Sequence, residues 1–218
     1  MEKYIIVPIN NISMVTTMYS DPEMRLKQLG DYNLPDYFIF PPEILSKIDD
    51  WETESKHWHF LVDLIINKIR YAKISYSHSL IEGCIFYSIQ ALEYSLKAKY
   101  CLYLNFKSNS EDADKFLLDR EISLGNFTND NDNKLREVGL ESIKEDITKL
   151  NNLRNGLFHF NYKKLMQGIK DLGWDYSSFE KEGSFIIYPN LVDDTLACNV
   201  FKKVIELLDI IFNVKKRT

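Results

Sequence analysis

The sequence has few of the residues that interrupt helices or cross-link small folds. Its 218 residues include 8 glycines, 6 prolines and 3 cysteines. The cysteines (Cys84, Cys101 and Cys198) form no CxxC pair and are odd in number, which fits a reducing, intracellular setting better than a disulfide framework. A chain of this length buries enough surface to fold without a metal ion or a disulfide.

Long hydrophobic runs and an excess of positive charge are also missing. No run approaches about 20 apolar residues, so we expect no membrane span. The first residues, MEKYIIVPINN, are broken by Pro8 and two asparagines before a signal-peptide core forms, so we expect a soluble cytoplasmic protein. The net charge of −5 argues against broad nonspecific adhesion to nucleic acid, although a local basic patch is compatible with it.

The 45% apolar and 13% aromatic residues are enough for a substantial core, and their spacing is helical over long stretches. The clearest helix is predicted over residues 78–105, where small residues at three-and-four spacing allow a neighbouring helix to approach closely. The other predicted helices run from PPEILSKIDDW to about Ser75, from about Asn133 through Leu157, and from about Asp193 to Val214. We predict an all-α bundle of four to five helices with minor β elements.

Two regions fall outside this helical pattern. Residues 1–42 are predicted to form an N-terminal extended arm, with a short strand or extended segment at 4–19 and little regular structure from Asp21 to Pro42, where prolines recur. The remainder, 43–218, is predicted to be one helical domain with an insertion at about 171–190 that contains a candidate strand, FIIY.

The helix predicted over 143–160 carries an arginine in an unexpected place. Its apolar stripe consists of Ile143, Ile147, Leu150 and Leu157. At about 100° per residue, Arg154 falls close to the centre of that stripe. Such a charge is paired, solvated through a groove, or reserved for a ligand. The partner of a plain structural pair would be Glu93 or Glu82.

Three further residues of the same helix, Asn155, Gly156 and His159, add to this pattern. Asn155 and His159 are four residues apart and share a face. Gly156 costs the helix roughly 1 kcal/mol relative to alanine, which predicts that another backbone approaches closely there. From the residues alone, His159 is either a catalytic group or an ordinary surface or capping histidine.

The segment LRNGLFHF (153–160) resembles the hallmark of the HEPN superfamily (higher eukaryotes and prokaryotes nucleotide-binding domain), an arginine followed by a polar residue and by a histidine after four to six positions. The preceding helix, SIQALEYSLKAKYCLYL, and the turn SLGNF (123–127) are also similar to HEPN segments, so the resemblance covers roughly residues 60–165 and implies a HEPN-like bundle. Some HEPN toxins carry a modifiable tyrosine two places after the histidine. Here Tyr162 lies three places after His159, so we do not expect this chain to be controlled by such a modification.

The resemblance implies a metal-independent endoribonuclease without a cofactor, active as a homodimer whose motif helices meet at a two-fold axis. His159 would act as a general acid or base, Arg154 would hold the phosphate and stabilise its charge, and Asn155 would orient either group. The nucleophile would be the RNA 2′-hydroxyl, and the setting a bacterial toxin or anti-phage effector with an antitoxin or sensor partner. The alternatives are an inactive HEPN module that binds RNA or nucleotide or only dimerises, and a helical interaction protein whose arginine is structural.

Lysines near the motif predict where an RNA backbone would lie. Lys149, Lys163 and Lys164 belong to a segment, 149–170, that contains no aspartate or glutamate. A solvated basic turn explains Lys163 and Lys164 equally well. The two histidines of HWH (57–59) point about 200° apart on a helix, so no metal site is expected from them.

Overall fold

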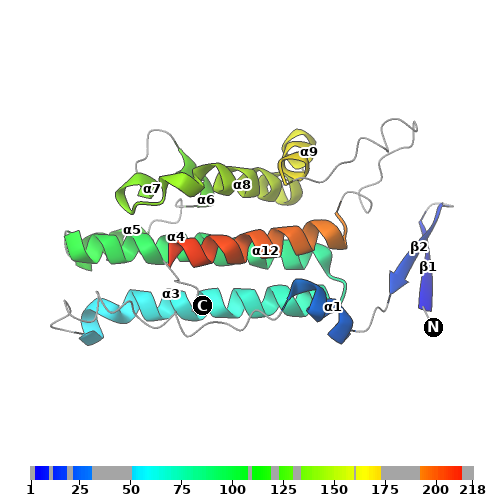
Figure 1. Cartoon of the computed structure of the whole chain (residues 1–218), viewed down its shortest axis with the longest axis horizontal. Helices are drawn as coiled ribbons and strands as arrows, with labels where there is room; N and C mark the ends of the chain where they lie inside the picture. The colour runs from blue at the N-terminus through cyan, green and yellow to red at the C-terminus, as the bar shows by residue number, and fades with distance from the viewer. Residues whose placement is uncertain are drawn as a thin grey trace.

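Four long helices carry most of the fold within the part of the chain that the structure describes, and this part is mostly helical, as predicted. The computed structural model describes residues 3–9, 12–18, 22–30, 51–107, 110–118, 123–129, 134–159, 161–172 and 192–212. The long helices are α3 (Trp51–Ser77), α4 (Ile81–Lys107), α8 (Lys144–Phe158) and α12 (Asp194–Ile211). α4 is central: it packs against α3, α12 and α8 (Figure 1). In the described part of the chain, no helix combines the length and the hydrophobicity needed to cross a membrane.

Small residues on α4 bring its neighbours close. Those that are buried are Cys84, Ser88, Ala91, Ser95 and Ala98. Both serine hydroxyls donate to the carbonyl four residues back, at 2.7 Å, so they need no partner from another helix. The prediction of a central helix with a small-residue stripe is confirmed. The helix begins at Ile81 rather than at His78, because the chain turns at Ser79, whose φ is 59°.

A glycine divides the helix that was expected to begin near Asn133. The short elements of this half are α5 (Ser110–Leu118), α6 (Leu124–Thr128), α7 (Lys134–Glu137), a 3₁₀ turn (Glu141–Ile143) and α9 (Tyr162–Asp171). After α7, Gly139 has a φ of 73°, which is left-handed backbone that glycine adopts without strain. The amide of Leu140 then donates to the carbonyl of Leu135 at 2.8 Å and closes the turn. The prediction of one continuous helix is therefore wrong.

Residues 22–29 form a helix, α1 (Pro22–Leu29), where recurring prolines predict little regular structure. Pro22 occupies the first helical position, where its missing N–H costs nothing, so this part of the prediction is wrong. Arg25 fixes α1 to the bundle. Its Nε donates to the carbonyl of Tyr76 at 2.7 Å, and its terminal nitrogens donate to the carboxylate of Asp194.

The N-terminal region contains an antiparallel hairpin of β1 (Lys3–Ile9) and β2 (Ile12–Met18), with Ile9 opposite Ile12. It lies within the segment for which the sequence favours a strand or an extended arm. Three other expectations lie outside the described residues: the strand FIIY with most of the insertion at 171–190, the helix start at 43–50, and the helix end at Val214.

Candidate functional site

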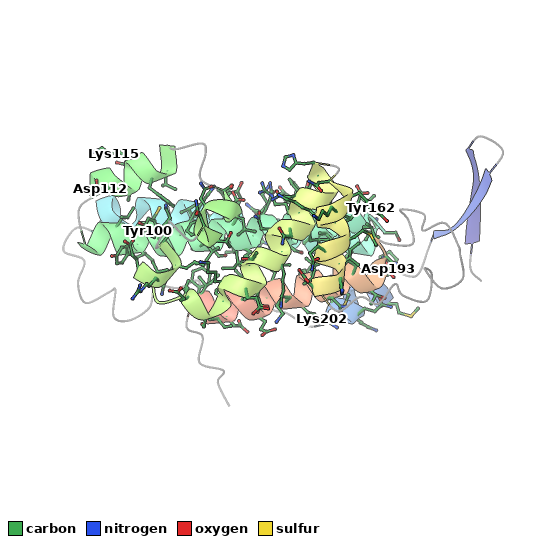
Figure 2. All side chains as sticks on the ribbon, turned by 90° about the horizontal axis from the view of Figure 1, so that it is seen from above. Tyr100, Asp112, Lys115, Tyr162, Asp193 and Lys202 are labelled. Atoms are coloured by element: carbon green, nitrogen blue, oxygen red, sulfur yellow. The ribbon has the colours of Figure 1, made fainter. Side chains whose placement is uncertain are left out.

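α8 and α9 cross closely at the predicted motif. α9 lies across α8 (Figure 2) and follows it after the turn that holds His159. A Cβ on Gly156 would lie 2.3 Å from the backbone nitrogen and Cα of Leu165. A Cβ on Gly168 would lie 2.7 Å from the same atoms of Leu153. Only glycine fits at both points, so the close backbone approach predicted at Gly156 is confirmed.

Arg154 lies at the edge of the buried face of α8 and not near its centre. The buried residues of this helix are Ile147, Leu150, Leu153, Gly156 and Leu157. Leu153 and Gly156 are covered by α9, a helix that the sequence analysis does not predict, so the buried arc extends further to that side than the expected stripe. The predicted central position of Arg154 is therefore wrong. Its side chain is 24% exposed and faces α4.

The partner of Arg154 is Glu93 of α4. It is one of the two carboxylates that the sequence suggests for this pair. A guanidinium nitrogen of Arg154 lies 3.7 Å from Oε2 of Glu93. The other oxygen, Oε1, accepts a hydrogen bond from Nζ of Lys97 at 2.9 Å, and the backbone N–H of Leu124, the first residue of α6, donates to Oε2 at 3.3 Å. One carboxylate is thus shared by two cations and a helix N-terminus. Within the described residues the guanidinium of Arg154 forms no hydrogen bond, so its N–H donors are not used by the fold.

His159 is exposed in the turn that ends α8. Its backbone N–H donates to the carbonyl of Asn155 at 3.2 Å, and the side chain of Asn155 is half-buried. Residues five positions apart on a helix point about 140° apart, so Arg154 and His159 point in different directions within one subunit. The structure therefore brings Asn155 and His159 together through the backbone and turns Arg154 toward α4.

Of the three lysines predicted to hold RNA, two are exposed beside the motif and one is engaged elsewhere. Lys163 and Lys164 are exposed in the first turn of α9. Lys149 is paired with Glu145 one turn earlier on α8, at 2.7 Å between Nζ and Oε1. Their hydrogen bond raises the pKa of Lys149 and lowers the pKa of Glu145. Glu145, which lies just before the basic segment 149–170, therefore neutralises the charge at the N-terminal end of that segment.

Comparison with known proteins gives no match to a family model, to a curated protein or to a solved structure. Among the described residues, no three His, Cys, Asp or Glu side chains are placed to share a metal ion. The region around Arg154 and His159 is therefore the candidate site.

A row of aromatic side chains that the sequence analysis does not single out adjoins this region. The ring of Phe158, the neighbour of His159 in the chain, lies 4.8 Å from the ring of Phe86 on α4. Phe86 lies 5.4 Å from Tyr87, and Tyr87 lies 5.4 Å from Tyr71 on α3. We call Tyr71, Tyr87, Phe86 and Phe158 the aromatic row. It combines three helices, so no pattern within one segment could reveal it.

Proposed function

We propose that this chain is a HEPN-type endoribonuclease that acts as a homodimer and cleaves RNA without a metal ion. The observation that carries the proposal is the setting of Arg154. Its side chain is 24% exposed, and its carboxylate partner, at 3.7 Å, is shared with Lys97. A permanently charged group in that setting retains N–H donors for a phosphate. The Arg-x4-His spacing of the HEPN motif adds the imidazole of His159.

The proposed reaction is an attack of the ribose 2′-hydroxyl on the adjacent phosphorus. The imidazole of His159 removes the hydroxyl proton, the O2′–P bond forms and the P–O5′ bond breaks, which leaves a cyclic phosphate. The 5′-oxygen takes a proton from His159 of the partner subunit. Arg154 stabilises the charge that develops on the phosphate oxygens, and Asn155 orients the phosphate. DNA lacks the attacking hydroxyl and is not cut.

The first turn of α9 supports an anionic ligand. Lys163 and Lys164 occupy its second and third positions, and no acidic residue balances them there. Positive charges at a helix N-terminus oppose the helix dipole, at a cost of about 0.3–1 kcal/mol each. A bound polyanion removes this cost, so we place the RNA backbone over the start of α9.

Exposed apolar side chains near this end of the bundle support the homodimer. Ile74 is 54% exposed, Leu80 60% and Tyr162 62%. They belong to the end of α3, the turn before α4 and the start of α9, which lie toward one end of the helical bundle (Figure 1). A second subunit would remove this apolar surface from water and bring two motifs together. The biological setting that we propose is a bacterial toxin or anti-phage effector, controlled by an antitoxin or sensor protein.

A second candidate is an inactive HEPN module that binds RNA or nucleotide, or that only dimerises. The pairing of Arg154 with Glu93 favours it, because that contact gives the guanidinium a role in the fold. The two candidates differ in turnover, so one assay separates them.

Incubation of the purified protein with RNA in EDTA is the test. Cleavage is expected, and His159→Ala should lower its rate by roughly 10²–10⁴-fold because the proton-transfer group is lost. Arg136→Ala is the control, since Arg136 is also exposed but lies on α7, outside the motif and outside the proposed dimer surface. Both variants should melt within about 2 °C of the parent. Full cleavage by His159→Ala contradicts the proposal, and RNA binding without turnover favours the inactive module.

A further inference from the structure

The aromatic row connects three helices and ends at the motif. Tyr71 on α3 and Phe158 on α8 are its two outer members, and they are 48% and 39% exposed. Tyr87 and Phe86 of α4 lie between them and are partly buried. Because Phe158 precedes His159 in the chain, the row leads directly to the proposed cleavage site.

A lysine lies among these rings. Nζ of Lys68 on α3 is 5.2 Å from the ring centroid of Tyr87 and 6.0 Å from the centroids of Tyr71 and Tyr94. Among the described residues Lys68 forms no ion pair with a carboxylate. Nζ of Lys97 lies 5.8 Å from the Tyr94 ring. Flat rings bordered by cations suit the bases and the phosphates of a nucleic acid.

Gln90 lies on the same face of α4, three residues after Tyr87 and four before Tyr94. In the described part of the chain, its Oε1 is the one buried side-chain nitrogen or oxygen without a hydrogen-bond partner. Buried acceptors are nearly always satisfied in folded proteins, so this amide gains a partner only by turning outward, or by admitting a water molecule or a ligand's donor. The ring or amino N–H of a nucleic-acid base is such a donor.

We propose that the aromatic row, together with Lys68, binds the unpaired bases of single-stranded RNA and leads the strand to the His159 turn. Bases stack on aromatic rings largely whatever their identity, whereas the bases of a duplex present no open face. The row therefore selects single strands over duplexes. This inference rests on the proposed function for the cutting of the strand, and it adds the class of substrate.

Fluorescence anisotropy with a labelled 2′-O-methyl oligonucleotide measures binding without cleavage, because the blocked 2′-oxygen cannot attack. A single strand of roughly 12 nucleotides, and the same strand annealed to its complement, are titrated with the whole protein. Tyr71→Leu and Tyr87→Leu should each weaken single-strand binding roughly tenfold, since a stacking ring is lost. Tyr103→Leu is the matched control: Tyr103 is also partly buried on α4, about four turns further along, and should change the affinity less than about twofold.

The charge of Lys68 is tested by salt. In Lys68→Met, the slope of the logarithm of affinity against the logarithm of salt concentration should fall by about one, because one phosphate contact is lost. An unchanged slope removes Lys68 from the proposed site.

Equal affinity for strand and duplex, or unchanged single-strand affinity in both tyrosine variants, overturns the proposal. A fall in dimer content in Tyr87→Leu, measured by sedimentation, also overturns it, since the row is then a subunit contact. The proposed function fails separately. If the parent protein binds the probe but leaves RNA uncut, the aromatic row binds RNA and the proposed catalysis is wrong. If both tyrosine variants cleave RNA with an unchanged KM, the catalysis stands and the proposed role of the aromatic row is wrong.

Discussion

Arg25 and Arg154 both point into the helical bundle, and their surroundings differ. Arg25 is 5% exposed, and it donates to the carbonyl of Tyr76 at 2.7 Å and to both carboxylate oxygens of Asp194. Its guanidinium carbon also lies 4.6 Å from the centroid of the Tyr76 ring. Arg154 has one carboxylate neighbour at 3.7 Å, and that carboxylate also binds Lys97.

This difference separates a charge that serves the fold from a charge that remains available to a ligand. A guanidinium carries five N–H donors in a fixed plane, and burial is tolerated when those donors are satisfied. Backbone, carboxylate and aromatic ring together satisfy Arg25. The surroundings of Arg154 do not, which is why we place the phosphate there.

Of the variants that compare the two arginines, Arg154→Met should have the largest effect: it should abolish most of the cleavage and preserve the fold. Loss of the charge that stabilises the phosphate should lower the cleavage rate by about 10²–10³-fold. Glu93 keeps its contacts with Lys97 and Leu124, so the free energy of unfolding should change by less than about 1 kcal/mol. Initial rates on RNA and urea denaturation measure the two quantities. A variant that unfolds easily but cleaves normally would make Arg154 a structural residue like Arg25.

Arg25→Met should have the opposite profile. The carboxylate of Asp194 loses its partner but is 49% exposed, so water replaces part of the interaction. We expect a loss of about 2–3 kcal/mol in the free energy of unfolding, less than for a fully buried pair. This corresponds to a melting temperature lower by roughly 5–10 °C.

Two measurements check this profile. Arg136→Met, at an exposed position of α7, is the control and should stay within about 0.5 kcal/mol of the parent. The cleavage rate of folded Arg25→Met should equal that of the parent at room temperature. If the cleavage rate falls together with the stability, the proposed division of roles, with Arg25 for the fold and Arg154 for the ligand, is wrong.

Gly156→Ala tests how much the close crossing of α8 and α9, next to Arg154, contributes to stability. The new methyl group would lie 2.3 Å from backbone atoms of Leu165, so α9 must move away. We expect a loss of about 2 kcal/mol by overpacking, measured by urea denaturation. At Gly125 the nearest atom is the flexible amide of Asn151 at 3.3 Å, so Gly125→Ala should be close to neutral. Alanine favours the helix over glycine, so a Gly156→Ala variant as stable as the parent would contradict the close crossing.

The smallest effect concerns Tyr76, which lies beneath Arg25. Its hydroxyl donates to Oε1 of Gln28 at 2.7 Å, so Tyr76→Phe should lose about 1 kcal/mol at pH 8. Burial raises the pKa of Tyr76 from 10.0 to about 12; the charge of Asp194 adds to this shift and that of Arg25 opposes it. Because the unfolded tyrosine ionises first, the advantage of the parent is complete below pH 10 and is lost as the pH rises toward 12.

Urea denaturation at pH 8 and pH 11 checks this expectation. The difference between parent and Tyr76→Phe should shrink by on the order of 1 kcal/mol. A difference that stays constant or grows would contradict the raised pKa.

Local patterns in the sequence predict what one segment determines by itself. The spacing in α4 predicts a central helix, and Gly156 predicts a close approach, because both depend on residues a few positions apart. The central position predicted for Arg154 is wrong because the extent of the buried face depends on α9, where Gly168 packs against Leu153 of α8. The sequence does not predict the helix at Pro22 or the break at Gly139, because the average tendencies of proline and glycine do not reveal their place in a helix or a turn.

The contact between Arg25 and Asp194 joins positions that are 169 residues apart. A ribosome that adds about 5–20 residues per second needs on the order of ten to thirty seconds between them. During that time α1 has been made and its carboxylate partner has not. The nascent chain can assemble α3 and α4, but Arg25 gains the carboxylate of Asp194 only when α12 has left the ribosome.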